Sequence, residues 1–291
     1  MDWIVLALLS AIMVSFAALL EKKVLIKEHA MEFATVLSIV SACLSLPFFL
    51  TIDYSLLTVQ SLLIVFFVSV LAAIAYILIA KSMRHISLAD SAALLVMAPA
   101  LTAILAAIFL GERLSAMQTS GLILLLIGAY VLELKAGAGF WEPFRIFKTS
   151  YYYHLLLIGI VVYAIASLYD RVLLTRYNMQ PEAIIAFAHL FIAVISFTIF
   201  TRFYNGMTGI KNGLKNYGWV ILLCAMLTVA HRYTQLEAAQ LAFIGLVAAI
   251  KRSSTLFTVL IGGEIFHESN IVRKALAAAI MVGGVLLITL S

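Results

Sequence analysis

Charged residues are scarce in this chain: they make up 11% of its 291 residues, whereas a soluble domain carries about 25%. Proline is sparse as well, with four residues, while hydrophobic residues reach 65%. A soluble fold with so few charges would expose far more apolar surface than the few hundred Å² that monomers tolerate. The composition therefore excludes a soluble globular protein and indicates that a lipid bilayer surrounds the chain.

Cysteine and the common catalytic motifs are equally limited. Cys43 and Cys224 both lie inside apolar runs, so neither a disulfide framework nor a cysteine metal site is expected. The sequence contains no Walker loop and no Gly-x-Ser-x-Gly, and no second histidine after His267 completes a zinc helix. We therefore expect no enzyme, no cofactor and no metal. The net charge of +5 indicates basic membrane loops rather than a nucleic-acid partner.

Ten apolar runs predict an all-α integral membrane protein with ten transmembrane helices, because a helix needs about 20 apolar residues to cross a bilayer. The alternating pattern of a membrane β-barrel is absent from the sequence. The first run lacks the basic start and the cleavage site of a signal peptide, so we expect it to remain as the first span. The runs are 3–20, 33–52, 61–80, 89–110, 117–134, 152–170, 183–203, 217–235, 239–262 and 272–290.

Two short segments recur after about 150 residues. Leu20-Glu21-Lys22, near the end of the first run, resembles Tyr169-Asp170-Arg171 at the end of the sixth. LTAILAAIFLGE at 101–112 ends like SSTLFTVLIGGE at 253–264. Self-similarity at a fixed offset is typical of chains built from structural repeats. The sequence therefore predicts two related halves.

The predicted halves are residues 1–135 and 151–291, joined by a linker at 136–150 whose aromatic and basic residues suit the membrane interface. Because each half has five helices, the second half enters the membrane in the opposite direction, as an inverted repeat. On this topology, 13 of the 19 Lys and Arg residues fall in loops on one side. Taken alone, that bias places both termini outside the cytoplasm.

Lys251 and Arg252 are the strongest candidates for a binding site, because they lie near the middle of the ninth run. A cation at the centre of a membrane helix costs about 2.5 to 3.5 kcal/mol. Either these two face a watery cavity and bind a carboxylate or phosphate, or they form buried salt bridges that hold helices in register. Adjacent residues point about 100° apart on a helix, so one of the two cations can bind the ligand while the other pairs with a counter-ion.

Further candidates come from the repeat. Pro99 lies where the 152-residue offset places Lys251, and it predicts either a broken helix at a site or a tolerated kink. Glu21-Lys22 and Asp170-Arg171 form interfacial charge pairs, or Glu21 and Asp170 act as counter-ions for the two cations or as proton-titrating groups.

His231 and Arg232, at the end of the eighth run, are candidate substrate contacts or packing residues. Gly111-Glu112 and Gly263-Glu264 are expected to close helices, with each glutamate facing the start of the next helix. Tyr76 and Tyr163 either line a cavity or pack between helices, and packing is the favoured interpretation.

The ten-helix plan and the segment PALTAILAAIFLGERLS at 99–115 resemble the EamA-type members of the drug/metabolite transporter superfamily over nearly the whole chain. The resemblance implies alternating access around a central cavity, no bound cofactor, and substrates ranging from amino acids and drugs to nucleotide sugars. Plastid sugar-phosphate translocators of this superfamily hold phosphate with an adjacent Lys-Arg, to which Lys251-Arg252 is similar. Family members are generally drawn with cytoplasmic termini, opposite to the charge bias, so both orientations stay open.

Together these observations predict a secondary transporter of a small organic metabolite that carries a carboxylate or phosphate. Coupling to protons or to a counter-substrate is compatible with this prediction, and no oligomeric state is predicted. Two alternatives stay open. The first is a drug or amino-acid exporter in which Lys251 and Arg252 are structural, and the second is a membrane receptor or subunit without flux.

Overall fold

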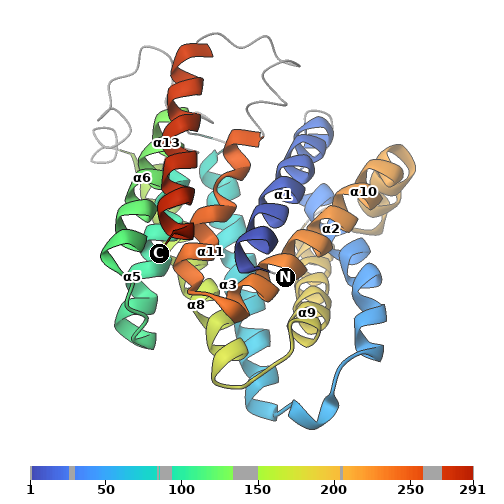
Figure 1. Ribbon diagram of the computed structural model, residues 1–291. Helices are drawn as coiled ribbons and strands as arrows, with labels where there is room; N and C mark the ends of the chain where they lie inside the picture. Colours follow the sequence, from blue (N-terminus) through green and yellow to red (C-terminus); the bar gives the residue numbers. More distant parts are fainter. Residues whose placement is uncertain are drawn as a thin grey trace.

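The computed structural model describes residues 2–25, 30–83, 85, 94–133, 150–203, 206–257 and 271–290. These ranges contain ten α-helices and two short 3-10 helices, and they contain no strand. Figure 1 shows the helices packed side by side in one bundle. The predicted all-α class is therefore confirmed.

The helices follow the predicted apolar runs. In the first half they are α1 (Trp3–Leu25), α2 (Ala30–Ser45), η1 (Leu46–Leu50), η2 (Tyr54–Leu56), α3 (Val59–Met83), α5 (Ala98–Leu110) and α6 (Ala116–Glu133). In the second half they are α8 (Tyr151–Thr175), α9 (Pro181–Phe203), α10 (Gly206–Leu241), α11 (Ile244–Lys251) and α13 (Ile271–Thr289). Five segments, on α1, α2 with η1, α3, α8 and α9, are long and apolar enough to cross a membrane. Apart from Ser150, the predicted linker lies outside the described residues.

The ninth apolar run is not the unbroken helix that we expected. The chain leaves helical conformation after Leu241, re-enters it at Ile244, and turns at Arg252-Ser253. Lys251 thereby occupies the last turn of α11, and Arg252 caps it. Carbonyl groups at the end of a helix carry partial negative charge and stabilise nearby cations. The break therefore reduces the cost of placing two positive charges within the bundle.

Pro99 also lies at a break rather than at a kink. The chain turns at Val96-Met97, and Pro99 occupies the first turn of α5. The backbone N–H of a residue in the first turn has no acceptor within the helix, so the missing N–H of proline costs no helical hydrogen bond there. The two interruptions lie 156 residues apart, within four residues of the 152-residue offset.

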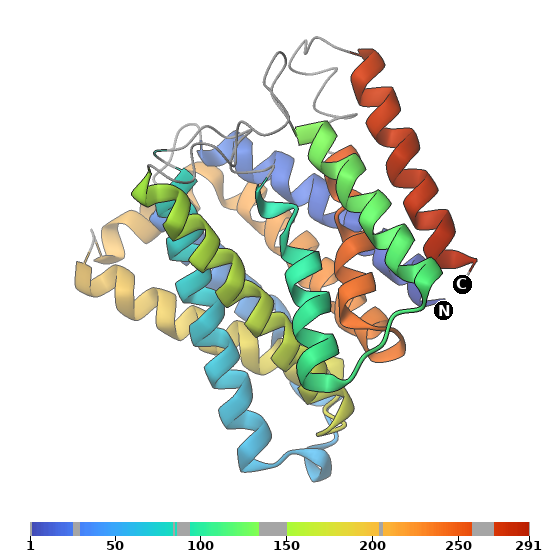
Figure 2. The ribbon, with the colours of Figure 1, turned by 90° about the vertical axis from the view of Figure 1, so that its left-hand side faces the viewer.

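Helices of one half pack mainly on helices of the other. α1 packs on α10, α3 on α8, α2 on α9, α5 on α11, and α6 on α13. The last pair is visible at one edge of the bundle in Figure 2. A Cβ atom on Gly121 would lie 2.7 Å from the carbonyl oxygen of Gly284, so these two backbones touch. Small residues permit such close packing of membrane helices.

The bundle has two ends that differ in their contacts. At the end drawn lower in Figure 1, where α2, α5, α8 and α10 finish, the amide of Asp53 donates to Gln180 Oε1 over 2.8 Å. We call this the lower end. At the upper end α1 and α3 finish, and α2 begins there because it follows α1 after four residues.

Candidate functional site

A cavity of about 430 Å³ lies among α1, α2, α3, α8, α9, α10 and Lys251 of α11. Its volume is within the range of small-molecule sites. The polar lining residues are Glu21, Thr35, Ser38, Ser41, Tyr76, Tyr163, Ser167, Asp170, His189, Ser196, Thr228, His231, Arg232, Gln235 and Lys251. Within the described ranges, no group of three His, Cys, Asp or Glu side chains is placed to hold a metal ion.

The first half lines the cavity with the upper parts of its helices, whereas α8 and α10 line it with Tyr163 to Asp170 and Thr228 to Gln235, which lie nearer the lower ends of those helices. α1 contributes lining residues only from Val14 to Glu21, and α2 only from Ala34 to Ser41. Since α1 finishes and α2 begins at the upper end, both stretches lie in the upper part of the bundle. Four of the five lining residues of α3, from Ala72 to Ile77, lie in the half of that helix that approaches the upper end, and Val68 lies just before its middle.

Lys251 reaches the cavity with a neutral partner. Its Nζ donates to Gln235 Oε1 over 2.6 Å. Among the described residues, no carboxylate oxygen lies within 4.0 Å of Nζ. The charge of Lys251 is therefore balanced by an amide dipole and the end of α11, and not by an ion pair. Its predicted anion-binding role stays a prediction.

Arg252 points elsewhere. It is absent from the cavity wall, and its guanidinium donates to the backbone carbonyl of Leu95. In a continuous helix that carbonyl would accept from residue 99, which is a proline without an N–H. Arg252 therefore joins the break in the second half to the break in the first, while Pro99 itself does not line the cavity.

Asp170 and Arg232 form a buried ion pair in the cavity wall. The Arg232 side chain donates to Asp170 Oδ2 over 2.7 Å. Asp170 is thus the counter-ion of Arg232 rather than of Lys251 or Arg252. The second oxygen of Asp170, Nδ1 of His231 and Oγ of Ser41 have no hydrogen-bond partner among the described residues. Buried polar atoms without partners cost about 1 to 3 kcal/mol each, so this wall offers polar groups that a bound solute or water can satisfy.

Glu21 lines the cavity from α1. Within the described part of the chain, its carboxylate forms no hydrogen bond and no ion pair. The neighbouring Lys22 belongs to α1, and the structure describes its backbone but not its side chain. Glu21 and Lys251 are therefore the two cavity charges that have no oppositely charged partner in the described ranges.

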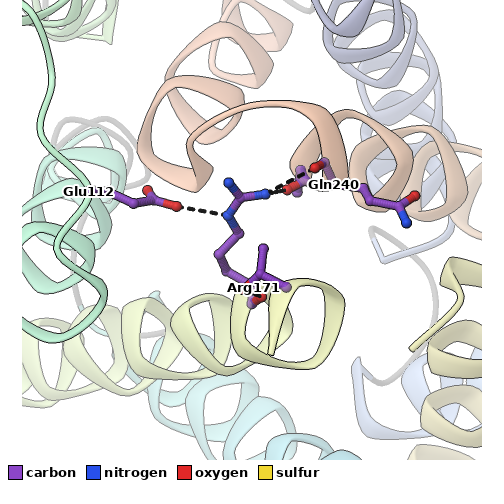
Figure 3. Close-up of polar contacts among 5 residues, drawn as sticks. Glu112, Arg171 and Gln240 are labelled. Atoms are coloured by element: carbon purple, nitrogen blue, oxygen red, sulfur yellow. Dashed lines mark hydrogen bonds and ion pairs between the residues drawn. The ribbon is translucent and has the colours of Figure 1, made fainter. Parts of the chain in front are cut away.

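Arg171 lies away from the cavity and joins three helix ends (Figure 3). Its Nε donates to Glu112 Oε1 over 2.7 Å, and its Nη1 donates to the carbonyls of Ala239 and of Gln240, the latter at 3.3 Å. Gly111 ends α5 in the left-handed conformation, with φ of 72°, as predicted. Glu112 pairs with Arg171 instead of facing the next helix, and Gly263-Glu264 lies outside the described residues.

Several cavity residues were missed or misjudged. Tyr76 and Tyr163 line the cavity, although we expected packing. Thr35, Ser38 and Ser41 recur every three residues, and this spacing places them on one face of α2. This polar stripe in the sequence could therefore have identified α2 as a helix that lines the cavity. Gln235 had a weaker signal, because a single amide in an apolar run also fits interhelical packing.

Comparisons with known proteins agree with this fold. The model of the EamA-like transporter family matches residues 1–134, which carry α1 to α6. A search of curated proteins finds no match. One crystal structure superposes on 99% of this chain and 95% of its own chain, with a TM-score of 0.73 and 16% identity, which shows likeness of fold. The chain is a multi-pass integral membrane protein, and its residues 1–134 are similar to the EamA-like transporter family.

Proposed function

We propose that this protein is a secondary transporter that moves a small organic anion by alternating access, and that Lys251 holds the carboxylate or phosphate of the substrate. One observation carries the proposal: the Lys251 ammonium lines a cavity of about 430 Å³ and bonds to the neutral Gln235. Placing a cation at this depth is costly. A bound anion offsets that cost, and it does so only while the substrate is present.

Arg232 supplies a second positive group in the same wall. One of its amino groups contacts Asp170, and its side chain keeps 23% of its surface exposed. A guanidinium has five N–H donors in a fixed fork, so others remain for a second oxygen of the substrate. Arg252 positions the segment that bears Lys251, since it anchors that segment to Leu95.

The two halves, 1–135 and 151–291, form the inverted repeat in this proposal. Exchanging them turns α1 into α8 and α3 into α10. The α1–α10 contact then becomes the α8–α3 contact, while α2–α9, α5–α11 and α6–α13 each map onto themselves. A two-fold axis in the membrane plane relates such halves, and this set of packing partners supports it.

A difference between the two ends of the bundle supports alternating access. Along α1, α2 and α3 the cavity approaches the upper end, while Arg171, Glu112 and the carbonyls of Ala239 and Gln240 tie helix ends together at the lower end. In the proposed cycle these lower contacts separate and the upper parts of α1, α2 and α3 close. The substrate then leaves through the opposite end.

Counterflow in proteoliposomes tests the proposal. We expect small carboxylates or phosphorylated metabolites to drive exchange, and Lys251→Met to abolish it without loss of the folded protein. The exposed Lys215 gives a matched control, since Lys215→Met removes one charge away from the cavity and should leave exchange intact. Stimulation by cations alone would favour the exporter alternative, and no flux with any panel would favour a receptor or subunit.

A further inference from the structure

The formal charges of the cavity wall sum to zero when Lys251 and Arg232 are counted as cations and Glu21 and Asp170 as anions. Asp170 and Arg232 neutralise each other, which leaves the cation of Lys251 and the carboxylate of Glu21 without ionic partners in the described ranges. We infer that the substrate is a zwitterion, whose anionic group binds Lys251 and whose cationic group binds Glu21. This inference rests on the proposed function and narrows it to one class of substrate.

The two charges lie at different levels of the cavity. Ser15 on α1 donates to the carbonyl of Ser254 over 2.8 Å, so α1 passes the break after Lys251 at the level of Ser15. Glu21 follows six residues later, which is about 9 Å along a helix that rises 1.5 Å per residue. Glu21 is therefore nearer the upper end than Lys251 is. The two side chains face different parts of one bound molecule.

Small apolar side chains form much of the wall between these levels. They come from α1, α2 and α3 and include Ala17, Ala18, Ala34, Ala72 and Ala73. Such residues leave room for an apolar body, and the hydroxyl groups of Thr35 and Ser38 lie on the same stretch of α2. The cavity thus has a positive group at Lys251, a negative group nearer the upper end, and a largely apolar space between them, which suits a compact zwitterion with a hydrocarbon side chain.

Electrostatic balance explains why a zwitterion is preferred to a simple anion. If an anion binds Lys251, the Glu21 carboxylate stays without a partner in a closing, poorly hydrated cavity. If a cation binds Glu21, the Lys251 ammonium stays without a partner in the same cavity. Charges that lose water without gaining a partner are strongly disfavoured. A zwitterion supplies a partner to both, so Glu21 discriminates against substrates that lack a cationic group.

Matched ligands on the purified protein test this inference. Leucine, isocaproate and isoamylamine share one carbon skeleton but carry both charges, the carboxylate only, or the ammonium only. γ-Aminobutyrate, butyrate and butylamine form a second set with a longer separation of charges. Calorimetry and ligand-dependent thermal shifts report binding without interference from passive permeation, because a ligand that binds the folded state raises its stability.

We expect a zwitterion of at least one set to bind at least tenfold more tightly than its own anion and its own cation. Glu21→Gln should reduce zwitterion affinity at least tenfold and leave anion affinity unchanged, while Lys251→Met should weaken both. Asp53→Asn is the matched control, because this carboxylate is exposed in the 51–58 connection and its loss should change neither affinity.

Two outcomes overturn the inference, and they differ in what they leave standing. If anions bind as tightly as their zwitterions, or if Glu21→Gln weakens both alike, then the zwitterion is wrong while loss of binding in Lys251→Met still supports an anion carrier. If neither anions nor zwitterions bind the folded wild-type protein, the proposed function falls together with the inference.

Discussion

The guanidinium of Arg252 donates to the carbonyl of Leu95, which lies four residues before Pro99. A proline cannot donate to that carbonyl, and the arginine takes the place of the missing N–H. The contact links the interrupted ninth span to the interrupted fourth span. It also explains how one of two adjacent cations can be structural while the other faces the cavity.

Replacing Arg252 tests whether its guanidinium takes the place of the N–H that Pro99 lacks. Arg252→Met should lower stability by about 1 to 3 kcal/mol, because it leaves a carbonyl in the bundle without a donor. Pro99→Ala restores an N–H at the position from which a helix would serve Leu95, so the arginine should matter less in that background. Melting temperatures of the two single variants and the double variant form a cycle, and simple additivity of their effects would contradict this explanation.

Gln235→Glu should inactivate the proposed anion site by occupying it. A carboxylate in place of the amide that now lies 2.6 Å from Lys251 Nζ forms an internal ion pair, and the substrate must then compete with it. We expect anion affinity to fall at least tenfold, measured by calorimetry, while the melting temperature is kept or raised. Gln235→Met is the control, because it removes the hydrogen bond without adding charge and should spare most of the affinity.

The Arg171–Glu112 pair should hold the lower end closed. Arg171→Met removes the ion pair and both carbonyl contacts, so the population open at the lower end should rise. A cysteine introduced by Ser167→Cys in a chain with Cys43→Ala and Cys224→Ala reports this state through impermeant thiol reagents added on each side. We expect faster labelling from the lower side in Arg171→Met.

Arg176→Met provides the matched control for this gate. Arg176 also lies near the lower end and contacts only the carbonyl of Phe109, at 3.4 Å, in the described part of the chain. Its loss should leave labelling unchanged. The reversed pair, Arg171→Glu with Glu112→Arg, should restore part of the protection. Equal labelling of all these variants would show that the pair does not act as a gate.

The α5–α11 crossing leaves no space for a side chain at Gly245. A Cβ atom there would lie 2.5 Å from the Cβ and 2.8 Å from the Cα of Ala103. Gly245→Ala should therefore cost about 1 to 3 kcal/mol through overpacking, and Ala103→Gly should recover part of the loss. Gly218→Ala is the control, since nothing lies within 4 Å of that position. Melting temperatures check the ranking, and an equal effect of the two alanines would contradict it.

The sequence predicts the helices well because bilayer thickness imposes long apolar runs. Pro99 predicts a broken helix or a kink near Val96-Met97, but the sequence does not predict the interruption at Arg252-Ser253, because that position lies inside a run that is apolar on average. What ends the helix there is tertiary. The break places Lys251 at a helix end and gives the Leu95 carbonyl a donor from the other half. Local hydropathy does not show which distant residues will make these contacts.

The candidate site is predicted in part for a related reason. Lys251, Asp170 and Arg232 line the cavity as expected of site residues, whereas Arg171 faces Glu112 at the lower end. Asp170 and Arg171 are neighbours whose side chains leave the helix about 100° apart. Only the position of the surrounding helices decides which neighbour meets the cavity, and a single sequence does not contain that information.

The glycine contacts of α6 and α13 have a practical use. Neither helix contributes a described residue to the cavity wall, and the backbone of Gly121 meets that of Gly284 with no side chain between them. Spin labels on the outer faces of these two helices should therefore keep a constant separation throughout turnover. Pulsed electron resonance on such a pair would supply an internal ruler, against which the displacement of every other helix can be measured.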